Sequence, residues 1–240
     1  MTEVMLRLEG ASKTYRQGPA EVVALAPTDL SIRAGDFVAV MGPSGSGKST
    51  MLLLLGGLSD PTTGRVTIDG HDVASLTPRQ RAALRRRSIG FVFQELNLLP
   101  GLTALENVTL PLELDGVRFR QARGQALAAL ERVEMDRFAD RFPDELSGGQ
   151  RQRVAIARAA VGPRRVLLAD EPTGALDTVT GEAVMRLLRA HCDGGGTAVM
   201  VTHDARLASW ADRVIFLQDG RIVDDARDAD PSVLLPGDAR

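Results

Sequence analysis

The pattern of apolar and polar positions divides the chain into a strand-rich start, two stretches in which strands and helices alternate, and a purely helical stretch between those two. Residues 4–33 alternate short apolar runs with turn residues, which is typical of antiparallel strands. Residues 34–94 and 164–225 alternate buried strands with helical patterns. This alternation predicts a mainly parallel sheet with helices on both of its faces. The pair Asp219-Gly220 predicts a tight hairpin turn that closes the sheet.

Between 95 and 163 the strand pattern is absent and helical periodicity takes over. Apolar side chains recur at helical spacing in the middle of this stretch, at Ala122, Ala126, Ala129, Leu130 and Val133. We therefore predict a single α/β domain with an N-terminal antiparallel β subdomain and an inserted helical subdomain. The expected parts are the core with the β subdomain at 1–94 and 164–225, the helical subdomain at 95–163, and an irregular tail at 226–240.

Three helix starts carry side chains that can satisfy free backbone N–H groups. Thr77 precedes Pro78, which combines an N-cap residue with proline at the first helical position. The segments 103–106 and 147–150 each begin with a hydroxyl residue that is followed three positions later by Glu or Gln, and this spacing is a capping box. Two glycines open the helix at 147–150, so its N-terminus is a candidate anion site.

Composition excludes several classes of protein and partner. The formal charge of −2 and the aromatic content of 4% argue against nucleic-acid binding, which uses basic surfaces and stacking rings. The lone Cys192 cannot form an internal disulfide, as is typical of a reducing compartment. The N-terminus lacks the apolar core of a signal peptide, and the longest apolar run, from Met51, is too short to span a bilayer. We expect a soluble chain whose membrane role requires a second polypeptide.

The stretch GPSGSGKS at 42–49 matches the phosphate-binding pattern G-x-x-x-x-G-K-[ST] in full, after a predicted strand and before a predicted helix. Glycines let backbone N–H groups wrap the phosphates, and the helix directs its positive end at them. Lys48 is expected to reach the β- and γ-phosphates and the Ser49 hydroxyl to bind Mg²⁺. Lys48 is also one of only two lysines among 29 basic residues. The predicted ATP-binding residues of this loop are Gly42, Pro43, Ser44, Gly45, Ser46, Gly47, Lys48, Ser49 and Thr50.

Two carboxylates follow the apolar strand at 165–170. We expect this strand to lie beside the strand that leads into the phosphate-binding loop, so that its carboxyl end faces the nucleotide. Asp170 is suited to hold Mg²⁺ through water, and Glu171 is suited to polarise the attacking water. The alternative is a solvated acidic pair at a strand end, and the complete loop at 42–49 makes the catalytic interpretation the favoured one.

Two further polar side chains end buried strands, and we interpret both as parts of the same site. The carboxyl ends of parallel strands meet at one edge of a sheet, so His203 is expected near Glu171, in contact with the γ-phosphate. Gln94 is interpreted in the same way, and a structural role is the alternative for both residues. His71 and His191 have no such support and are expected to be surface or packing residues.

With these motifs in order, the chain resembles the ATP-binding-cassette (ABC) ATPases over about residues 4–225. The elements that carry the resemblance are Tyr15, GPSGSGKST, Gln94, LSGGQ, VLLADE, GALD and His203. The resemblance implies a P-loop NTPase (RecA-like) core that hydrolyses ATP with Mg²⁺. It implies Glu171, His203 and Lys48 as catalytic residues, and the metal held by Ser49, Gln94 and Asp170.

The resemblance also implies a role for the second candidate anion site. In ABC ATPases two cassettes pair head to tail around two ATP molecules, and each phosphate-binding loop faces the LSGGQ segment of the other cassette. Tyr15 is thereby expected to stack on adenine, Gln94 to link the metal and the water to a membrane partner, and Asp177 to report across the dimer interface. GALD departs modestly from the family's usual residues at 174 and 175 and keeps the aspartate. The LSGGQ residues expected to bind the partner's ATP are Ser147, Gly148, Gly149 and Gln150.

Within the family, LLGGLSDPTTGRV and IGFVFQELNLLPGLTALENVTLPL look like the macrolide-export and lipoprotein-release group. This resemblance implies a homodimer of cassettes at the cytoplasmic face of the cell membrane, powering a separate permease with four transmembrane helices and a large extracytoplasmic domain. The expected cargo is a lipoprotein, peptide or drug. The apolar stretch after Gln94 is the expected coupling surface, with the core of the helical subdomain as the alternative interpretation.

Three other functions stay open. A cell-division cassette that drives a non-transporting membrane protein, and so regulates wall hydrolases, has the same catalytic residues. A DNA-repair or ribosome-associated cassette is less favoured, because those chains carry coiled-coil insertions or tandem cassettes. A P-loop protein that binds nucleotide only as a structural support is disfavoured by the intact Glu171 and His203.

Overall fold

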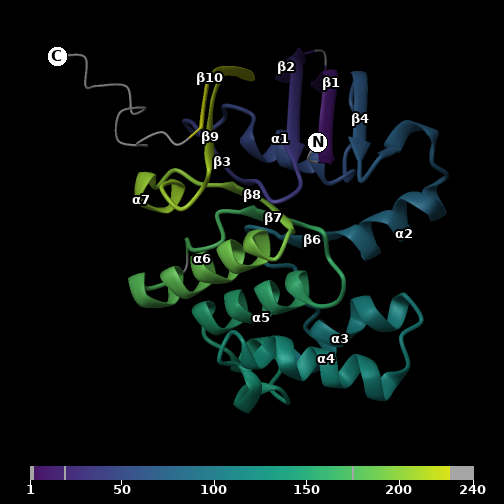
Figure 1. Ribbon diagram of the computed structural model, residues 1–240, viewed down its shortest axis with the longest axis vertical. Helices are drawn as coiled ribbons and strands as arrows, with labels where there is room; N and C mark the ends of the chain where they lie inside the picture. The colour runs from purple at the N-terminus through teal and green to yellow at the C-terminus, as the bar shows by residue number, and fades with distance from the viewer. Residues whose placement is uncertain (1–2, 19, 175, 228–240) are drawn as a thin grey trace.

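The computed structural model describes residues 3–18, 20–174 and 176–227, and it contains two sheets and the helices that pack on them (Figure 1). The smaller sheet is antiparallel, with the strand order β2-β1-β4-β5. Its strands are β1 (Val4–Gln17), β2 (Ala20–Arg33), β4 (Thr63–Ile68) and β5 (His71–Asp72). The antiparallel pair predicted for residues 4–33 is therefore confirmed.

The larger sheet has the strand order β10-β9-β3-β8-β7-β6. Its strands are β3 (Phe37–Met41), β6 (Ile89–Val92), β7 (Val166–Asp170), β8 (Thr197–Val201), β9 (Arg213–Gln218) and β10 (Arg221–Arg227). All neighbours are parallel except β9 and β10, which form the hairpin predicted at Asp219-Gly220. Both turn residues have positive φ angles, 49° for Asp219 and 71° for Gly220, as a primed turn between twisted strands requires.

One predicted neighbour relation is wrong. We expected the strand at 165–170 to lie beside the strand that precedes the phosphate-binding loop, but β8 lies between β7 and β3. The pattern of apolar residues does not encode strand order, because each of these buried strands is apolar on both faces. The functional expectation is unaffected, since parallel strands end at the same edge whatever their order.

Seven α-helices occur within the described residues, together with short 3₁₀ turns at Val73–Ser75, Asp136–Phe138 and Pro143–Glu145. The helices are α1 (Lys48–Leu55), α2 (Pro78–Ser88), α3 (Ala104–Leu114), α4 (Phe119–Glu131), α5 (Gly148–Ala160), α6 (Thr178–Asp193) and α7 (Ala205–Ala208). The predicted caps are confirmed, because Thr77, Thr103 and Ser147 each accept a hydrogen bond from the backbone N–H three residues on.

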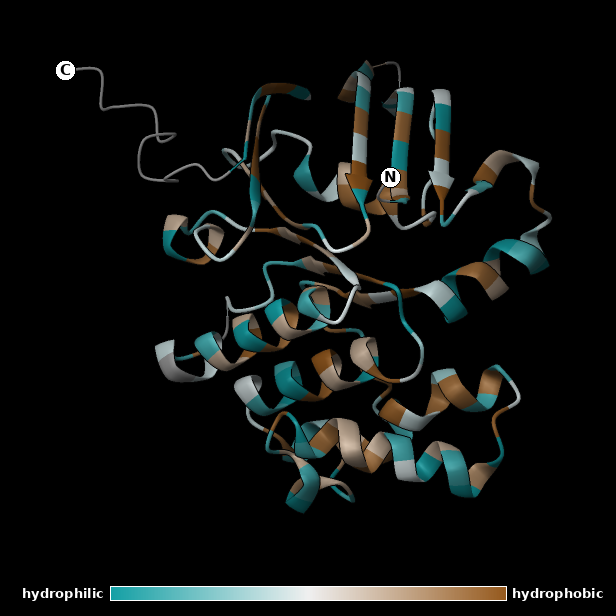
Figure 2. Cartoon of the chain, in the orientation of Figure 1, coloured by the Kyte–Doolittle hydropathy of each residue, from teal (hydrophilic) through white to brown (hydrophobic). Residues whose placement is uncertain are grey.

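The larger sheet separates two apolar cores. Along β3, Val38 and Val40 face one core, while Phe37, Ala39 and Met41 face the other, following the period of two that a strand imposes. The first core contains α1 and the antiparallel sheet, so a helix and the predicted antiparallel β subdomain together cover that face. The second core contains residues of α3, α4, α5 and α6 (Figures 1 and 2).

The helical stretch predicted at 95–163 packs around α5, with α3 and α4 on its outer side (Figure 1). The five apolar residues predicted on one face of α4 and just beyond it are all buried, which gives that helix its packing surface. The division into subdomains stays a prediction, because α5 also lies directly on β6. A Cβ added at Gly90 would lie 1.9 Å from the carbonyl oxygen of Ala159, so only glycine allows this approach.

Of the predicted irregular tail, residues 226 and 227 belong to β10, and 228–240 lie outside the described residues.

Candidate active site

The loop at 42–49 is held rigidly between strands that are distant in the sequence. A Cβ at Gly42 would lie 2.0 Å from the carbonyl oxygen of Leu217, and one at Gly47 would lie 2.2 Å from that of Ala24. Both glycines have positive φ angles, 145° and 100°. The backbone of the loop is therefore pressed against β9 and β2, and no side chain fits at either position.

Hydrogen bonds complete this support. Gly220 N–H donates to the carbonyl of Ser46 over 3.0 Å, and Ala26 N–H donates to the carbonyl of Gly220 over 2.8 Å. The closing hairpin thus connects the phosphate-binding loop to the antiparallel sheet through hydrogen bonds that no local sequence pattern predicts. Rigid support of this kind preorganises backbone N–H groups for a ligand.

Two side chains of the loop indicate an anion site. The Lys48 ammonium donates to the carbonyls of Gly42 and Pro43, at 2.9 and 2.8 Å, so it lies folded over the mouth of its own loop. The hydroxyl of Ser46 is buried and has no hydrogen-bond partner among the described residues. A buried hydroxyl without a partner is costly, and a phosphate oxygen is the kind of acceptor that removes this cost.

The carboxyl ends of three parallel strands meet beside this loop. Val40, Val201 and Asp170 lie in register on β3, β8 and β7. His203 and Glu171 follow β8 and β7, and His203 Nδ1 lies 2.9 Å from Glu171 Oε1. The prediction that these two side chains lie at one edge is therefore confirmed. Glu171 also has a φ of 48°, an unfavourable angle for a non-glycine residue that occurs preferentially at functional sites.

The backbone hydrogen bond of Glu171 explains how this angle is maintained. Its N–H donates to the carbonyl of Val201 over 3.0 Å, which holds the residue to the end of β8. The carboxylate is four-fifths buried, whereas the imidazole of His203 is 77% exposed. Glu171 is thus fixed by the sheet, and His203 is free to exchange this contact for another acceptor.

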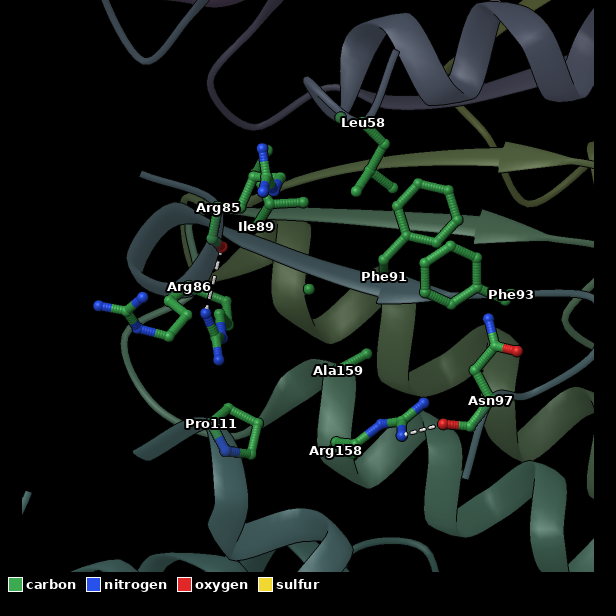
Figure 3. A pocket seen from close by; sticks show the side chains of 13 residues that line it. Leu58, Arg85, Arg86, Ile89, Phe91, Phe93, Asn97, Pro111, Arg158 and Ala159 are labelled. Carbon is green, nitrogen blue, oxygen red and sulfur yellow. Dashed lines mark hydrogen bonds between the residues drawn. The ribbon is translucent and has the colours of Figure 1, made fainter. Parts of the chain in front are cut away.

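Gln94 is exposed, two residues beyond the end of β6, in a loop that the helix α5 holds in place. Arg158 donates to the carbonyls of Leu96 and Asn97, each over 2.6 Å, and Figure 3 shows the contact with Asn97. Leu96 and Asn97 both have positive φ angles, 61° and 48°. Two charge-assisted hydrogen bonds therefore stabilise a strained turn next to Gln94.

A second side chain of α5 reaches the loop after Glu171. Gln152 is buried and donates from Nε2 to the carbonyl of Pro172 over 2.6 Å. Gln152 and Arg158 were not singled out from the sequence, although Gln152 shares a face with the apolar Ile156 and Ala159, which is a signal for a buried polar contact. The helix that begins with LSGGQ is thus tied to the loops that carry Gln94 and Glu171.

The remaining predicted residues lie as follows. Tyr15, on β1, is 38% exposed, and the Lys13 ammonium lies 5.2 Å from the centre of its ring. Asp177 is the N-cap of α6 and accepts from the Thr180 N–H over 3.0 Å. Ala175, within GALD, lies outside the described residues.

The two remaining histidines are surface or packing residues, as predicted, and Cys192 lies beside His191 on α6. His71 is exposed and His191 packs at the end of α6. Cys192 is buried, and burial raises the pKa of its thiol to about 12, so it is no nucleophile at neutral pH.

A groove opens between α1, α2, β6 and α5 (Figure 3). Phe91 and Phe93 stack with their ring centroids 4.1 Å apart and form its apolar wall together with Leu58, which is 42% exposed. Arginines line the opposite side, among them Arg86 and Arg158. The groove thus combines apolar, aromatic and cationic side chains, and its lining includes residues on both sides of Gln94 in the sequence, Phe93 and Asn97.

Among the described residues, 3–18, 20–174 and 176–227, no helix is both long and apolar enough to cross a membrane. In the same residues, no three His, Cys, Asp or Glu side chains cluster as ligands for a metal ion.

The strand–loop–helix at Lys48, the carboxylates at the end of β7 and the histidine after β8 define a P-loop ATPase. A family model described as ABC transporter matches residues 25–174. An uncharacterised ABC transporter ATP-binding protein of Methanocaldococcus jannaschii, MJ0796, is 48% identical over 223 residues, which are 91% of this chain and 95% of that protein. The macrolide export ATP-binding/permease protein MacB of Brucella melitensis is 47% identical over 226 residues.

The chain belongs to the ABC transporter family and is an ATP-binding, ATP-hydrolysing cassette of that family. A solved dimeric structure of MJ0796 in a post-hydrolysis state, bound to ADP and Pi, superposes with a TM-score of 0.90 at 45% identity and covers 94% of this chain and 99% of that one. The likeness to MacB covers 94% of this chain but only 35% of MacB, so the chain spans about a third of the length of that relative.

Proposed function

We propose that two copies of this chain pair head to tail, hydrolyse ATP with Mg²⁺ at two shared sites, and so drive a separate membrane permease. The observation that carries the proposal is the placement of α1 and α5. Both begin with an anion-binding type of N-terminus, but they pack into different cores on opposite faces of the larger sheet. An LSGGQ segment placed in this way is suited to a nucleotide on another subunit.

The residues of the site fit both ligands. The glycine cradle at Gly42 and Gly47 and the unpartnered hydroxyl of Ser46 suit the phosphates. Ser49, Gln94 and Asp170 offer the hydroxyl, amide and carboxylate oxygens that Mg²⁺ prefers. Mg²⁺, when bound, neutralises charge that develops on the transferred phosphoryl group.

The chain's own residues perform the other steps. Lys48 leaves its two loop carbonyls and binds the β- and γ-phosphates. Glu171 accepts the proton of the attacking water, and His203 leaves Glu171 to donate to the γ-phosphate. From the partner subunit, the capped helix start at Ser147 supplies backbone N–H groups to the same phosphate. Tyr15 stacks on the adenine, and Asp177 contacts the partner across the interface.

The groove beside Gln94 is the proposed docking surface of the permease. Its apolar wall and its arginines suit a short amphipathic segment of a partner. The names of the MacB relatives join ATP-binding and permease functions in one protein, which favours a permease of the macrolide-export or lipoprotein-release type as the partner. We further propose that this permease has four transmembrane helices and a large extracytoplasmic domain. We place the cassette at the cytoplasmic face of the membrane.

The Glu171→Gln variant tests the shared site. It keeps the shape of the side chain but removes the base, so ATP is bound and hydrolysed slowly, and the dimer accumulates. Light scattering in ATP and Mg²⁺ is expected to report a mass of two chains for Glu171→Gln and of one chain for the same variant without nucleotide. A monomer under both conditions contradicts the scheme.

The matched variant Gly148→Asp tests the contribution of the partner subunit. A Cβ at Gly148 meets nothing within 4 Å, so the substitution leaves the monomer intact and adds charge only where the partner's phosphate is expected. Hydrolysis is expected to be lost while ATP binding to the monomer persists. Lost ATP binding in the monomer contradicts the assignment.

The membrane partner needs a separate measurement. Affinity purification of the tagged chain from mild-detergent extracts, followed by mass spectrometry, is expected to recover a four-helix permease with a large outer domain. Recovery of a division-site membrane protein instead supports a mechanical regulator and overturns the transporter assignment, while the ATPase chemistry stands.

A further inference from the structure

Arg164 is a buried cation without a carboxylate partner. It lies between α5 and β7 and only 9% of the residue is exposed. Its guanidinium donates to the carbonyl of Val161 over 3.2 Å and, over a longer 3.4 Å, to that of Arg85. Among residues 3–18, 20–174 and 176–227, no Asp or Glu oxygen lies within ion-pairing distance of it. Burial is the main cause that lowers the pKa of Arg164, to about 10; the negative charge of Asp115 offsets part of this shift, and the positive charge of Arg86 adds to it.

The space around Arg164 is open and strongly cationic. It lines two adjoining cavities, the groove described above, of about 280 Å³, and a second one of about 560 Å³ between α2, α3, α4 and α5. Both cavities share Arg86, Pro111 and Arg164 as lining residues. Six arginines line the pair in all, namely Arg85, Arg86, Arg87, Arg132, Arg158 and Arg164.

A single carboxylate faces these six arginines. Asp115 lies 2.8 Å from Arg87 Nε and 3.5 Å from Arg86 Nη2, so its two oxygens are already shared by two exposed or half-exposed arginines. The lining residues therefore have a formal charge of +5, in a chain whose total formal charge is −2. The Nε of Arg86 is buried as well and has no partner among the described residues.

We propose that Arg164 and Arg86 form a binding site for a phosphate group, distinct from the phosphate-binding loop. Burying a charge is costly unless an opposite charge pairs with it. Among the described residues, Arg164 has no carboxylate within ion-pairing distance, and a bound phosphate supplies the missing negative charge. The planar guanidinium fork matches phosphate oxygens in geometry. A phosphate monoester also carries a charge of about −1.5 to −2 at neutral pH, which fits this surplus better than a single carboxylate does.

Two sources supply this chemistry, free inorganic phosphate or a small phosphate ester on one side and the headgroup of an anionic phospholipid on the other. The site does not depend on the proposed permease or on the catalytic scheme, because none of its residues belongs to the phosphate-binding loop, the carboxylates of β7 or LSGGQ. It does share the groove with the proposed docking surface, so an occupied site also changes the charge that a docking partner meets.

The first experiment measures thermal unfolding with and without inorganic phosphate in a Lys48→Ala background, which removes the phosphate-binding loop from the comparison. Phosphate at about ten times its dissociation constant is expected to raise the Tm by ~3–5 °C. Adding Arg164→Gln is expected to abolish this rise, and Arg164→Lys to keep part of it. The control Arg221→Gln, an exposed arginine at the start of β10, is expected to retain the rise in full. An equal rise with and without Arg164 overturns the proposal.

The second experiment distinguishes the two sources of the phosphate group, and its spectroscopic part does not require the Arg164→Gln variant to fold. In the ¹⁵N spectrum of the Lys48→Ala chain, the Nε resonance of Arg164 is expected to shift with added phosphate. Vesicles that contain phosphatidic acid, a phosphate monoester, are expected to co-sediment more chain than vesicles of phosphatidylcholine, with the difference lost in Arg164→Gln, if the ligand is a headgroup. A phosphate titration that moves the resonance without Arg164-dependent vesicle binding assigns a free phosphate. An unmoved resonance and equal sedimentation in both vesicle types overturn the proposal.

Discussion

Glu171 and His203 come from two neighbouring strands and meet with Glu171 Oε1 2.9 Å from His203 Nδ1. The two residues are 32 positions apart in sequence, and the parallel pairing of β7 with β8 brings them together. In this arrangement the backbone of Glu171 is held by the end of β8, and the imidazole of His203 is 77% exposed. We therefore expect the effects of substituting Glu171 and His203 on the rate of hydrolysis to depend on each other.

A double-mutant cycle measures this dependence. Glu171→Gln is expected to lower the rate of phosphate release by roughly 10²–10⁴, the usual contribution of a general base. His203→Ala is expected to lower it less. Because residues that act as a unit are not additive, the double variant is expected to be about as slow as Glu171→Gln alone. Fully additive losses, with ATP affinity unchanged, contradict a direct functional coupling of the pair.

The phosphate-binding loop offers a matched pair of glycines. Gly45 and Gly47 both have positive φ angles, 79° and 100°, but a Cβ at Gly45 meets nothing within 4 Å, whereas one at Gly47 meets the carbonyl of Ala24 at 2.2 Å. Gly45→Ala is expected to cost only the ~1–2 kcal/mol of a left-handed residue. Gly47→Ala is expected to cost clearly more in the free energy of unfolding, measured with urea. Equal losses contradict the close approach of the loop to β2.

Arg158 is expected to position the loop that carries Gln94. Its two hydrogen bonds of 2.6 Å to Leu96 and Asn97 are charge-assisted, one part-buried and one exposed, so each is worth at most about 1.5–3 kcal/mol. Arg158→Met is expected to speed hydrogen exchange at 94–98 and to lower kcat while nucleotide affinity persists, with partial rescue in Arg158→Lys. The control is Arg151→Met, since the bonds of Arg151 to backbone carbonyls are long, at 3.4 and 3.5 Å. Unchanged exchange in Arg158→Met contradicts the positioning role.

His191 predicts a dependence of stability on pH. Burial lowers the pKa of this imidazole below its ordinary value of 6.5, and a backbone hydrogen bond involving Arg165 offsets part of the shift. The folded state therefore favours neutral His191, so its contribution to stability is fully present above about pH 6.5 and is lost as the pH falls below that value. Between pH 7.5 and 5.5 the Tm of the natural chain is expected to fall by ~2 °C more than that of His191→Gln. Parallel curves for the two proteins contradict this assignment.

Local patterns in the sequence predicted much of the fold, and they selected the residues of the candidate site. The capping boxes at Thr103 and Ser147 and the turn at Asp219-Gly220 depend on residues a few positions apart, so short-range spacing predicts them. The expectation that Glu171 and His203 share an edge depends only on parallel strands ending together. Their catalytic roles, like those of the other predicted site residues, stay predictions.

Tertiary structure alone decided the features that join distant segments. The order of β3, β8 and β7 was predicted wrongly because buried strands are apolar on both faces and carry no mark of their neighbours. The support of the phosphate-binding loop by the closing hairpin, and the contacts of Gln152 and Arg158 with two separate loops, join atoms 20 or more residues apart. The sequence by itself determined the phosphate-binding loop motif and the helix caps, because these are local features of the chain, and from them it predicted which residues carry the chemistry. The packing of α5 and of the hairpin decided how those residues are held, because the acceptor of a long-range hydrogen bond is set by which distant segment packs against the donor.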